Sequence, residues 1–290
     1  MKRIKLRMKH KHAMQGYFFI LPFIIGCAVF FIYPIYTSLR LSFSRIEQFS
    51  GLKGLVWIGN DNYIRAFATD TEFVPVFLTV IRDTVINSPL IVIFSLIISI
   101  FINKQLKLKG FFRAIFFLPF LLGTGYVMQK LLGIGIGNTS ISRGIVLPEE
   151  MADYFGPTAW NIITELLDRI TLILWKSGVQ ILIFLSGLQG ISRSLYESAK
   201  CDSATEWDMF WKITLPMISP IILLNMVYTI VDSFTDIGNP LVDHFYATAF
   251  RALQLAYSCA MSWIYFIFIL LVLGIVFASM KRVTFYAGQK

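Results

Sequence analysis

Long charge-free stretches constrain this chain more than any other feature of its sequence. Residues 13–39, 84–103 and 258–280 contain no Asp, Glu, Lys or Arg. A helix rises about 1.5 Å per residue, so about 20 apolar residues cross the ~30 Å hydrocarbon core of a bilayer. A spanning segment must satisfy its own backbone hydrogen bonds, and runs of this length therefore predict transmembrane helices.

The composition agrees with a chain that crosses a bilayer several times. Hydrophobic residues make up 56% of the sequence and charged residues only 15%, against about a quarter in soluble domains. The net charge of +9 does not indicate nucleic-acid binding, because the basic residues lie in short loops beside apolar runs. The three cysteines share no metal-ligand spacing and predict no disulfide framework. The start resembles a signal peptide, but its apolar run is too long, so we expect a retained helix.

Basic segments without acidic residues set the expected orientation. Residues 1–12 and 104–113 carry Lys and Arg but no acid, which places both on the cytoplasmic side. We therefore expect an all-α membrane protein with about six transmembrane helices and both termini in the cytoplasm. The expected layout is a membrane domain at 13–282 between cytoplasmic tails at 1–12 and 283–290, with helices at about 13–39, 73–103, 114–132, 170–190, 217–237 and 258–280 and a cytoplasmic loop at 192–216.

The predicted spans contain no catalytic equipment. The histidines His10, His12 and His244 lie outside them, and the sequence has no nucleophile-elbow, zinc-protease, Cys-x-x-Cys or phosphate-loop motif. We therefore expect a chain that is not an enzyme and holds no cofactor or metal. ATP hydrolysis that drives such a protein would have to come from another chain.

One predicted helix, at 217–237, carries a polar face. Four polar residues recur at spacings of four, three and four, which puts them on one side: Asn225, Thr229, Asp232 and Asp236. In a spanning helix such residues face the bundle interior or a watered cavity, because facing lipid is costly. They predict either the wall of a solute pathway or contacts between helices. Lys176 and Gln180 on the preceding helix are the expected companions, with Lys176 pairing Asp232 or meeting an acidic solute.

Residues 192–216 interrupt two apolar runs with a charged segment on the cytoplasmic side. The pattern Ser194-Leu-Tyr-Glu197 predicts a capping box at the start of a helix. That helix would carry a stripe of mostly apolar and small residues: Tyr196, Ala199, Ser203, Trp207, Phe210 and Trp211. Taken alone, the segment fits an amphipathic connector at the membrane surface.

The order of residue types in this segment is more specific. Glu197-Ser-Ala199, then Asp202-Ser-Ala204, Phe210 and Ile213-x-Leu215-Pro216 resemble the E-A-A-x-x-D-G-A…F…I-x-L-P signature of the membrane subunits of binding-protein-dependent ABC importers. The sequence departs from that signature at two positions, with Ser198 in place of Ala and Ser203 in place of Gly. Tyr33-Pro34 and Gly59-x-x-Asn62-Tyr63 are similar to the N-terminal half of the sugar permeases of the maltose and glycerol-phosphate importer families.

The resemblance implies a fold like that of type I ABC importer permeases, in a bacterial cytoplasmic membrane. The chain would form half of a pathway for a sugar or oligosaccharide, together with a second, often non-identical permease subunit. An extracytoplasmic binding protein would deliver the sugar, and a cytoplasmic ATPase dimer would bind ATP and magnesium. The residues implied in ATPase coupling are Tyr196, Glu197, Ala199, Asp202, Ser203, Ala204, Phe210 and Pro216.

Two other functions stay open on the sequence alone. One is an ABC permease for a non-sugar solute such as a polyamine or a phosphate ester. The other is a self-sufficient ion-coupled secondary carrier, which would need ion-coupling acids near the bilayer midplane and for which Asp232 is the one candidate.

Overall fold

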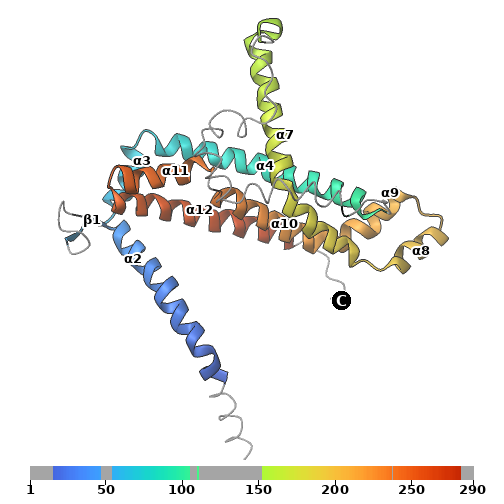
Figure 1. Ribbon diagram of the computed structural model, residues 1–290, viewed down its shortest axis with the longest axis horizontal. Coiled ribbons are helices and arrows are strands. Elements are labelled where there is room, and N and C mark those ends of the chain that lie inside the picture. The colour runs from blue at the N-terminus through green and yellow to red at the C-terminus, as the bar shows by residue number, and fades with distance from the viewer. Residues whose placement is uncertain (1–15, 47–53, 105–109, 111–151, 237, 282–290) are drawn as a thin grey trace, which may run out of the picture. The chain divides into compact units, whose positions relative to one another are not determined.

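The computed structural model describes residues 16–46, 54–104, 110, 152–236 and 238–281 (Figure 1). The chain divides into two compact units, which are described in turn below. One unit contains residues 1–76 and 240–268, and the other contains residues 77–239 and 269–290.

Five helices of the described residues are long and apolar enough to cross a membrane, and the expected helix at 114–132 lies outside the described residues. The first runs over Gly16–Ser42 and contains the π-helical turn η1 (Ala28–Ile32) and α2 (Tyr33–Ser42). The others are α4 (Phe73–Asn103), α7 (Ala152–Gln189), α10 (Leu215–Thr235) and α12 (Leu255–Lys281). The protein is therefore an all-helical membrane protein in its spanning part.

The remaining elements are short. They are the antiparallel strands β1 (Ser44–Ile46) and β2 (Leu55–Trp57), the helices α3 (Asp61–Ala68), α8 (Arg193–Cys201), α9 (Glu206–Met209) and α11 (Pro240–Tyr246), and the π-helical turns η4 (Phe210–Thr214) and η5 (Ala247–Arg251). The hairpin and α3 both fall between the first membrane helix and α4.

Helix α7 begins 18 residues before the expected start at 170. Gly156, with a φ of +74° and a ψ of 159°, interrupts the helix near its start, and the 34 residues of Gly156–Gln189 would extend about 51 Å, well beyond the thickness of the hydrocarbon core. The polar part outside the core is stabilised by an ion pair between Arg169 and Glu165 at 2.8 Å, one helical turn apart. Arg169 also donates to Oδ1 of Asn87 at 3.2 Å. An apolar pattern detects only the part of such a helix that lies in lipid.

In the first unit, α3 is fastened to the end of the first membrane helix by a buried amide. Nδ2 of Asn62 donates to the carbonyl oxygens of Ser42 at 2.9 Å and Ser44 at 3.0 Å. The Tyr63 hydroxyl lies 2.7 Å from Oγ of Ser42. Gly59 precedes α3 with a φ of +65°, a conformation that suits glycine. The Gly59-x-x-Asn62-Tyr63 pattern is therefore a structural motif that positions α3.

The same unit contains a polar cluster at the start of α4. Oδ1 of Asp70 accepts hydrogen bonds from the backbone N–H groups of Glu72 and Phe73, each at 2.9 Å. The Tyr257 hydroxyl donates to Oδ2 of Asp70 at 2.6 Å, and the guanidinium of Arg65 lies 4.1 Å from the centre of the Tyr257 ring. Partial burial raises the pKa of Asp70, but these hydrogen bonds outweigh it and hold the pKa below its ordinary value.

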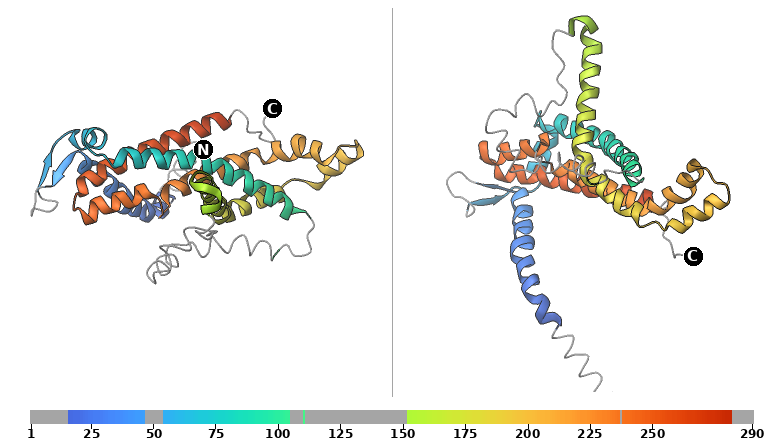
Figure 2. Two further views of the ribbon diagram at one scale, coloured as in Figure 1. Left: turned by 90° about the horizontal axis from the view of Figure 1, so that it is seen from above. Right: turned by 45° about the vertical axis from the view of Figure 1, so that its right-hand side comes forward.

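In the second unit, α7 and α10 lie side by side and pack closely (Figure 2). A Cβ placed on Gly187 of α7 would lie 2.8 Å from Cγ1 of Ile221 in α10, so glycine allows this approach. The inner ends of the helices share a buried apolar cluster of Leu188, Ile191 and Ile218. This helix pair carries the polar residues singled out by the sequence, and the segment with the importer signature connects its two members.

Candidate functional site

The segment 192–216 forms two short helices separated by a turn. Helix α8 ends at Cys201, and α9 begins at Glu206 and continues through η4 into α10. In the turn, Ser203 has a φ of +59°, and the N–H of Ala204 bonds to the carbonyl of Ala199 at 3.0 Å. Ser203 therefore takes the left-handed conformation at the position where the importer signature has glycine.

The predicted capping box at Ser194 is wrong. Helix α8 starts at Arg193, its N-cap is Ser192, and the Ser192 side chain makes no capping bond. The Ser194 hydroxyl instead lies 2.7 Å from the Ser192 hydroxyl. Helix α7 ends at Gln189, and Ser192 has an extended backbone with a ψ of 133°. The next helix therefore begins directly after Ser192, ahead of Ser194.

A capping box does occur in this segment, at the start of α9. The Thr205 hydroxyl accepts from the Asp208 N–H at 3.2 Å, and the Asp208 carboxylate accepts from the Thr205 N–H at 3.4 Å. The sequence carries the Thr-x-x-Asp spacing for it. The break between α8 and α9 also means that the predicted continuous stripe from Tyr196 to Trp211 does not form.

The expected coupling residues divide into exposed and half-buried groups. The exposed ones lie on α8 and the turn: Glu197, Asp202 and Ser203. The half-buried ones are Tyr196, Ala199, Ala204, Phe210 and Pro216. Tyr196 packs inward against the apolar cluster at the end of α7 and α10, and its hydroxyl lies 2.9 Å from Oγ1 of Thr214. Part of the Tyr196 side chain is therefore covered by residues of its own chain.

An exposed aromatic pair beside this turn was absent from the predicted site. Trp207 and Trp211 are 70% and 50% exposed, and their ring centroids are 5.6 Å apart. The Phe210 ring contacts both, with its centroid 6.3 Å from that of Trp207 in a tilted arrangement and 5.2 Å from that of Trp211 in an edge-to-face one. The sequence pattern assigned Trp207 to one long stripe with Tyr196. The turn at Ser203 separates the two.

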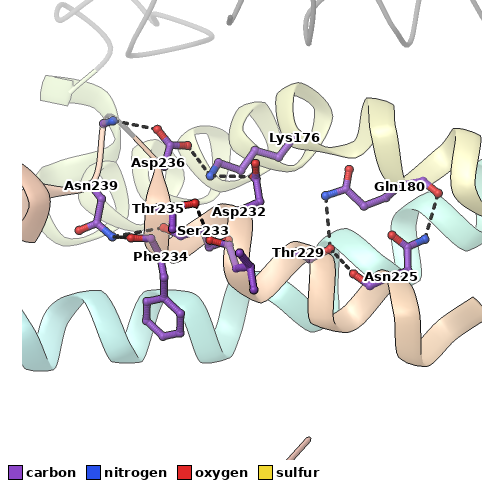
Figure 3. Close-up of polar contacts among 12 residues, drawn as sticks. Lys176, Gln180, Asn225, Thr229, Asp232, Ser233, Phe234, Thr235, Asp236 and Asn239 are labelled. Carbon is purple, nitrogen blue, oxygen red and sulfur yellow. Dashed lines mark hydrogen bonds and ion pairs between the residues drawn. The ribbon is translucent and has the colours of Figure 1, made fainter. Parts of the chain in front are cut away.

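The charged part of the polar face forms an ion cluster between α7 and α10 (Figure 3). Nζ of Lys176 lies 3.4 Å from Oδ2 of Asp232 and also forms an ion pair with Asp236. The Lys176 side chain is 15% exposed, against 35% and 36% for the two aspartates. Asp236 also accepts the N–H of Gly238 at 2.8 Å, which closes the end of α10. Lys176 is thus paired with acids of its own chain.

The uncharged part of the face is buried between the same helices (Figure 3). Nδ2 of Asn225 donates to the Gln180 carbonyl at 3.0 Å, and Nε2 of Gln180 donates to Oγ1 of Thr229 at 3.3 Å. The Thr229 hydroxyl donates to the Asn225 carbonyl at 2.8 Å. These bonds leave two buried amide oxygens, Oε1 of Gln180 and Oδ1 of Asn225, without a partner among the described residues.

Comparison with known proteins gives a consistent set of relatives. No family model matches the chain. The chain is 29% identical over 308 residues to a probable ABC transporter permease, YesP of Bacillus subtilis, covering 99% of this chain and 96% of YesP. It is 29% identical to the arabinooligosaccharides permease AraP of the same organism, covering 88% and 85%. It is 27% identical to the trehalose/maltose permease MalF of Thermococcus litoralis, covering 78% and 76%.

Solved structures give the same fold. A bacterial ABC transporter involved in the import of the acidic polysaccharide alginate matches with a TM-score of 0.64, 20% identity and coverage of 97% of this chain and 99% of the other. The fold is therefore that of a membrane chain of an ABC importer, and the relatives are named as ABC transporter permeases and sugar-transport permeases. The chain is thus similar over most of its length to permease proteins of carbohydrate transport systems.

Proposed function

We propose that this chain forms half of the translocation pathway of an ATP-driven oligosaccharide importer. A second permease subunit supplies the other half, and an extracytoplasmic binding protein delivers the solute. A cytoplasmic ATPase dimer binds ATP and magnesium, so this chain holds neither. Several relatives support a carbohydrate as the solute, since they are named as permeases for arabinooligosaccharides, lactose and trehalose/maltose.

We propose that α8 and the following turn dock on the ATPase. The observation that carries this proposal is an exposed helix and turn, built from the importer signature, that is joined through η4 to α10. Glu197 and Asp202 are exposed there and offer carboxylates to basic or polar groups of a partner. Ala199 and Ala204 leave a shallow surface that a groove can cover.

We assign the polar face to two different tasks. The aspartates of the ion cluster are about a third exposed, so their oxygens are accessible to solute hydroxyl groups. Gln180, Asn225 and Thr229 are at most 1% exposed and bond to one another, which suits a contact that fixes α7 against α10. We therefore propose Lys176, Asp232 and Asp236 as the residues of this chain that contact the solute.

A charge reversal at Glu197 tests the docking role. The permease pair is co-expressed with the ATPase subunit, and the ATPase that copurifies with the membrane complex is measured. We expect Glu197→Lys to reduce copurification and ATP-dependent uptake at least tenfold. The new lysine would face basic or polar groups of the ATPase in a contact that excludes water, where like charges repel strongly. Asp168→Lys, a reversal at an exposed acid on the outer part of α7, is the matched control and should change neither. Normal copurification of Glu197→Lys would rule out docking through this residue.

Uptake assays separate this function from the two others. Proteoliposomes with the complete importer and binding protein are given labelled arabinooligosaccharides, lactose, trehalose and maltose. Our proposal predicts uptake of at least one of these sugars that requires both the ATPase subunit and ATP. Uptake by the permease pair alone, driven by an ion gradient, would identify a secondary carrier. ATP-dependent uptake of glycerol phosphate but of none of these sugars would identify a non-sugar importer.

A further inference from the structure

Tyr196 joins α8 to the start of α10, and the inference drawn from this contact rests on the proposed docking of α8. The Tyr196 ring packs on the apolar cluster at the inner ends of α7 and α10, with Ile213 and Met217 also in contact. Its hydroxyl lies 2.9 Å from Oγ1 of Thr214, and Thr214 is only 7% exposed. The bond is therefore partly shielded from water.

The direction of this hydrogen bond follows from its neighbour. Oγ1 of Thr214 lies 3.3 Å from the Met209 carbonyl oxygen, which can only accept. The Thr214 hydroxyl has one proton and donates it there, so Tyr196 is the donor to Thr214. The result is a chain of hydrogen bonds from α8, through Thr214, to the carbonyl at the end of α9.

Thr214 occupies a mechanically sensitive position. It is the last residue of η4, the π-helical turn that connects α9 to α10. Wide turns of this kind interrupt the regular ladder of an α-helix and occur frequently at functional sites. If η4 bends easily, a displacement of α8 is absorbed there and does not reach α10. A contact that stiffens this connection is therefore needed for α8 to move α10. The contact between Tyr196 and Thr214 spans this connection.

We propose that Tyr196 is a positioning residue whose hydrogen bond to Thr214 holds α8 and α10 together, so that movement of the docked α8 is transmitted to the transmembrane helix. A second contact also reaches this region, the ion pair between Lys104 and Glu206 at 2.8 Å. Its side chains are 57% and 81% exposed, and exposed pairs contribute little. We therefore assign transmission to the hydrogen bond between Tyr196 and Thr214, which is partly buried.

The test measures uptake and ATP hydrolysis together in the reconstituted importer, using whichever of the four sugars the wild-type protein takes up. Tyr196→Phe and Thr214→Val each remove one hydroxyl and keep the shape. We expect each to lower sugar transported per ATP hydrolysed about two- to tenfold, the range that one net hydrogen bond allows. The double variant should be no worse than either single one, because both remove the same bond.

Three controls keep a structural defect apart from lost transmission. Thr214→Ser retains a hydroxyl and should restore the wild-type ratio. Thr171→Val removes a hydroxyl that bonds only within α7, and Lys104→Gln removes the exposed ion pair, so neither should change the ratio. ATPase copurification should be unchanged in all variants.

The outcomes separate this inference from the function on which it rests. An unchanged transport-to-hydrolysis ratio in Tyr196→Phe and Thr214→Val would overturn the transmission role while leaving docking intact. Loss of ATPase copurification in Tyr196→Phe would also overturn it, since Tyr196 would then belong to the docking surface. Failure of the wild-type chain to retain the ATPase would instead contradict the proposed function itself.

Discussion

Ser203 shows how a single departure from a family pattern is accommodated. Its φ of +59° costs a residue with a Cβ about 1–2 kcal/mol relative to the right-handed region. A glycine would avoid this cost. It would lower the free energy of unfolding by about 0.4–1 kcal/mol, however, because glycine gives the unfolded chain more conformational freedom to lose on folding. The second effect offsets part of the first, so a serine at this turn costs at most about 1–2 kcal/mol and is tolerated.

This comparison predicts different effects of two substitutions of Ser203 on the affinity for the ATPase. Ser203→Gly should change ATPase affinity less than threefold. Ser203→Val should weaken it about tenfold, because a β-branched residue fits a left-handed backbone poorly. Binding of the ATPase to detergent-solubilised permease measures both. Equal affinities for the glycine and valine variants would contradict the backbone argument.

Asp70 makes stability depend on pH. Its pKa is lowered in the folded protein, so its contribution is fully present above the ordinary value of 3.8 and is lost as the pH falls through the folded value. Its carboxylate caps α4 and accepts from Tyr257, and loss of such a cap costs about 1 kcal/mol. We expect Asp70→Ala to have a lower Tm than the wild type at pH 7. This difference in Tm between the two proteins should become smaller below pH 4.

The measurement is thermal unfolding of the purified chain in detergent between pH 3 and pH 7. Asp83→Ala is the matched control, because Asp83 pairs only with its exposed neighbour Arg82 at 3.1 Å. Its Tm should stay within the error of the wild type at pH 7. A Tm difference for Asp70→Ala that grows as the pH falls would have the wrong sign for a carboxylate with a lowered pKa.

At the scale of elements, the pairing of α7 with α10 depends on Gly187. A methyl group there would lie 2.8 Å from Cγ1 and 3.2 Å from Cγ2 of Ile221, a stiff β-branched side chain. Gly187→Ala should therefore destabilise the protein by about 1–3 kcal/mol despite a better helix propensity. Gly274→Ala is the control, because no atom lies within 4 Å of the added Cβ and only the propensity gain remains.

Thermal unfolding distinguishes the two glycines. The Tm should fall for Gly187→Ala and should rise slightly or stay the same for Gly274→Ala. A similar shift in both variants would show that close packing of α7 on α10 is not needed.

The elements also show which parts of the structure a sequence can reveal. Membrane-spanning helices were predictable because charge-free runs of this length have few other stable conformations. The outer part of α7 was not, because polar helices outside the bilayer are stabilised by pairs such as Arg169 with Glu165, which leave no apolar pattern. The turn at Ser203 was missed because serine is uncommon in its left-handed conformation.

The candidate site was predictable in its residues more than in its contacts. The spacing placed Asn225, Thr229 and Asp232 on one helical face, and the structure turns that face toward α7. Whether Lys176 met a solute or an acid of its own chain depended on the register between two helices. The contact of Tyr196 with Thr214 depended on the break in the segment, which no local pattern indicated.

At the scale of the whole molecule, the central claim is that the segment 192–216 lies in the cytoplasm and is covered by an ATPase. Cys201 reports on both parts of this claim, because it is exposed at the end of α8. Replacing Cys27 and Cys259 with alanine leaves Cys201 as the single thiol of the chain. A water-soluble maleimide can then be applied to either face of sealed vesicles.

The most direct test is the rate at which this maleimide modifies Cys201 in inside-out and right-side-out vesicles, with and without the ATPase subunit. We predict modification only in inside-out vesicles, slowed at least tenfold when the ATPase is bound. Modification from the outer face, or an equal rate with and without the ATPase, would contradict the account.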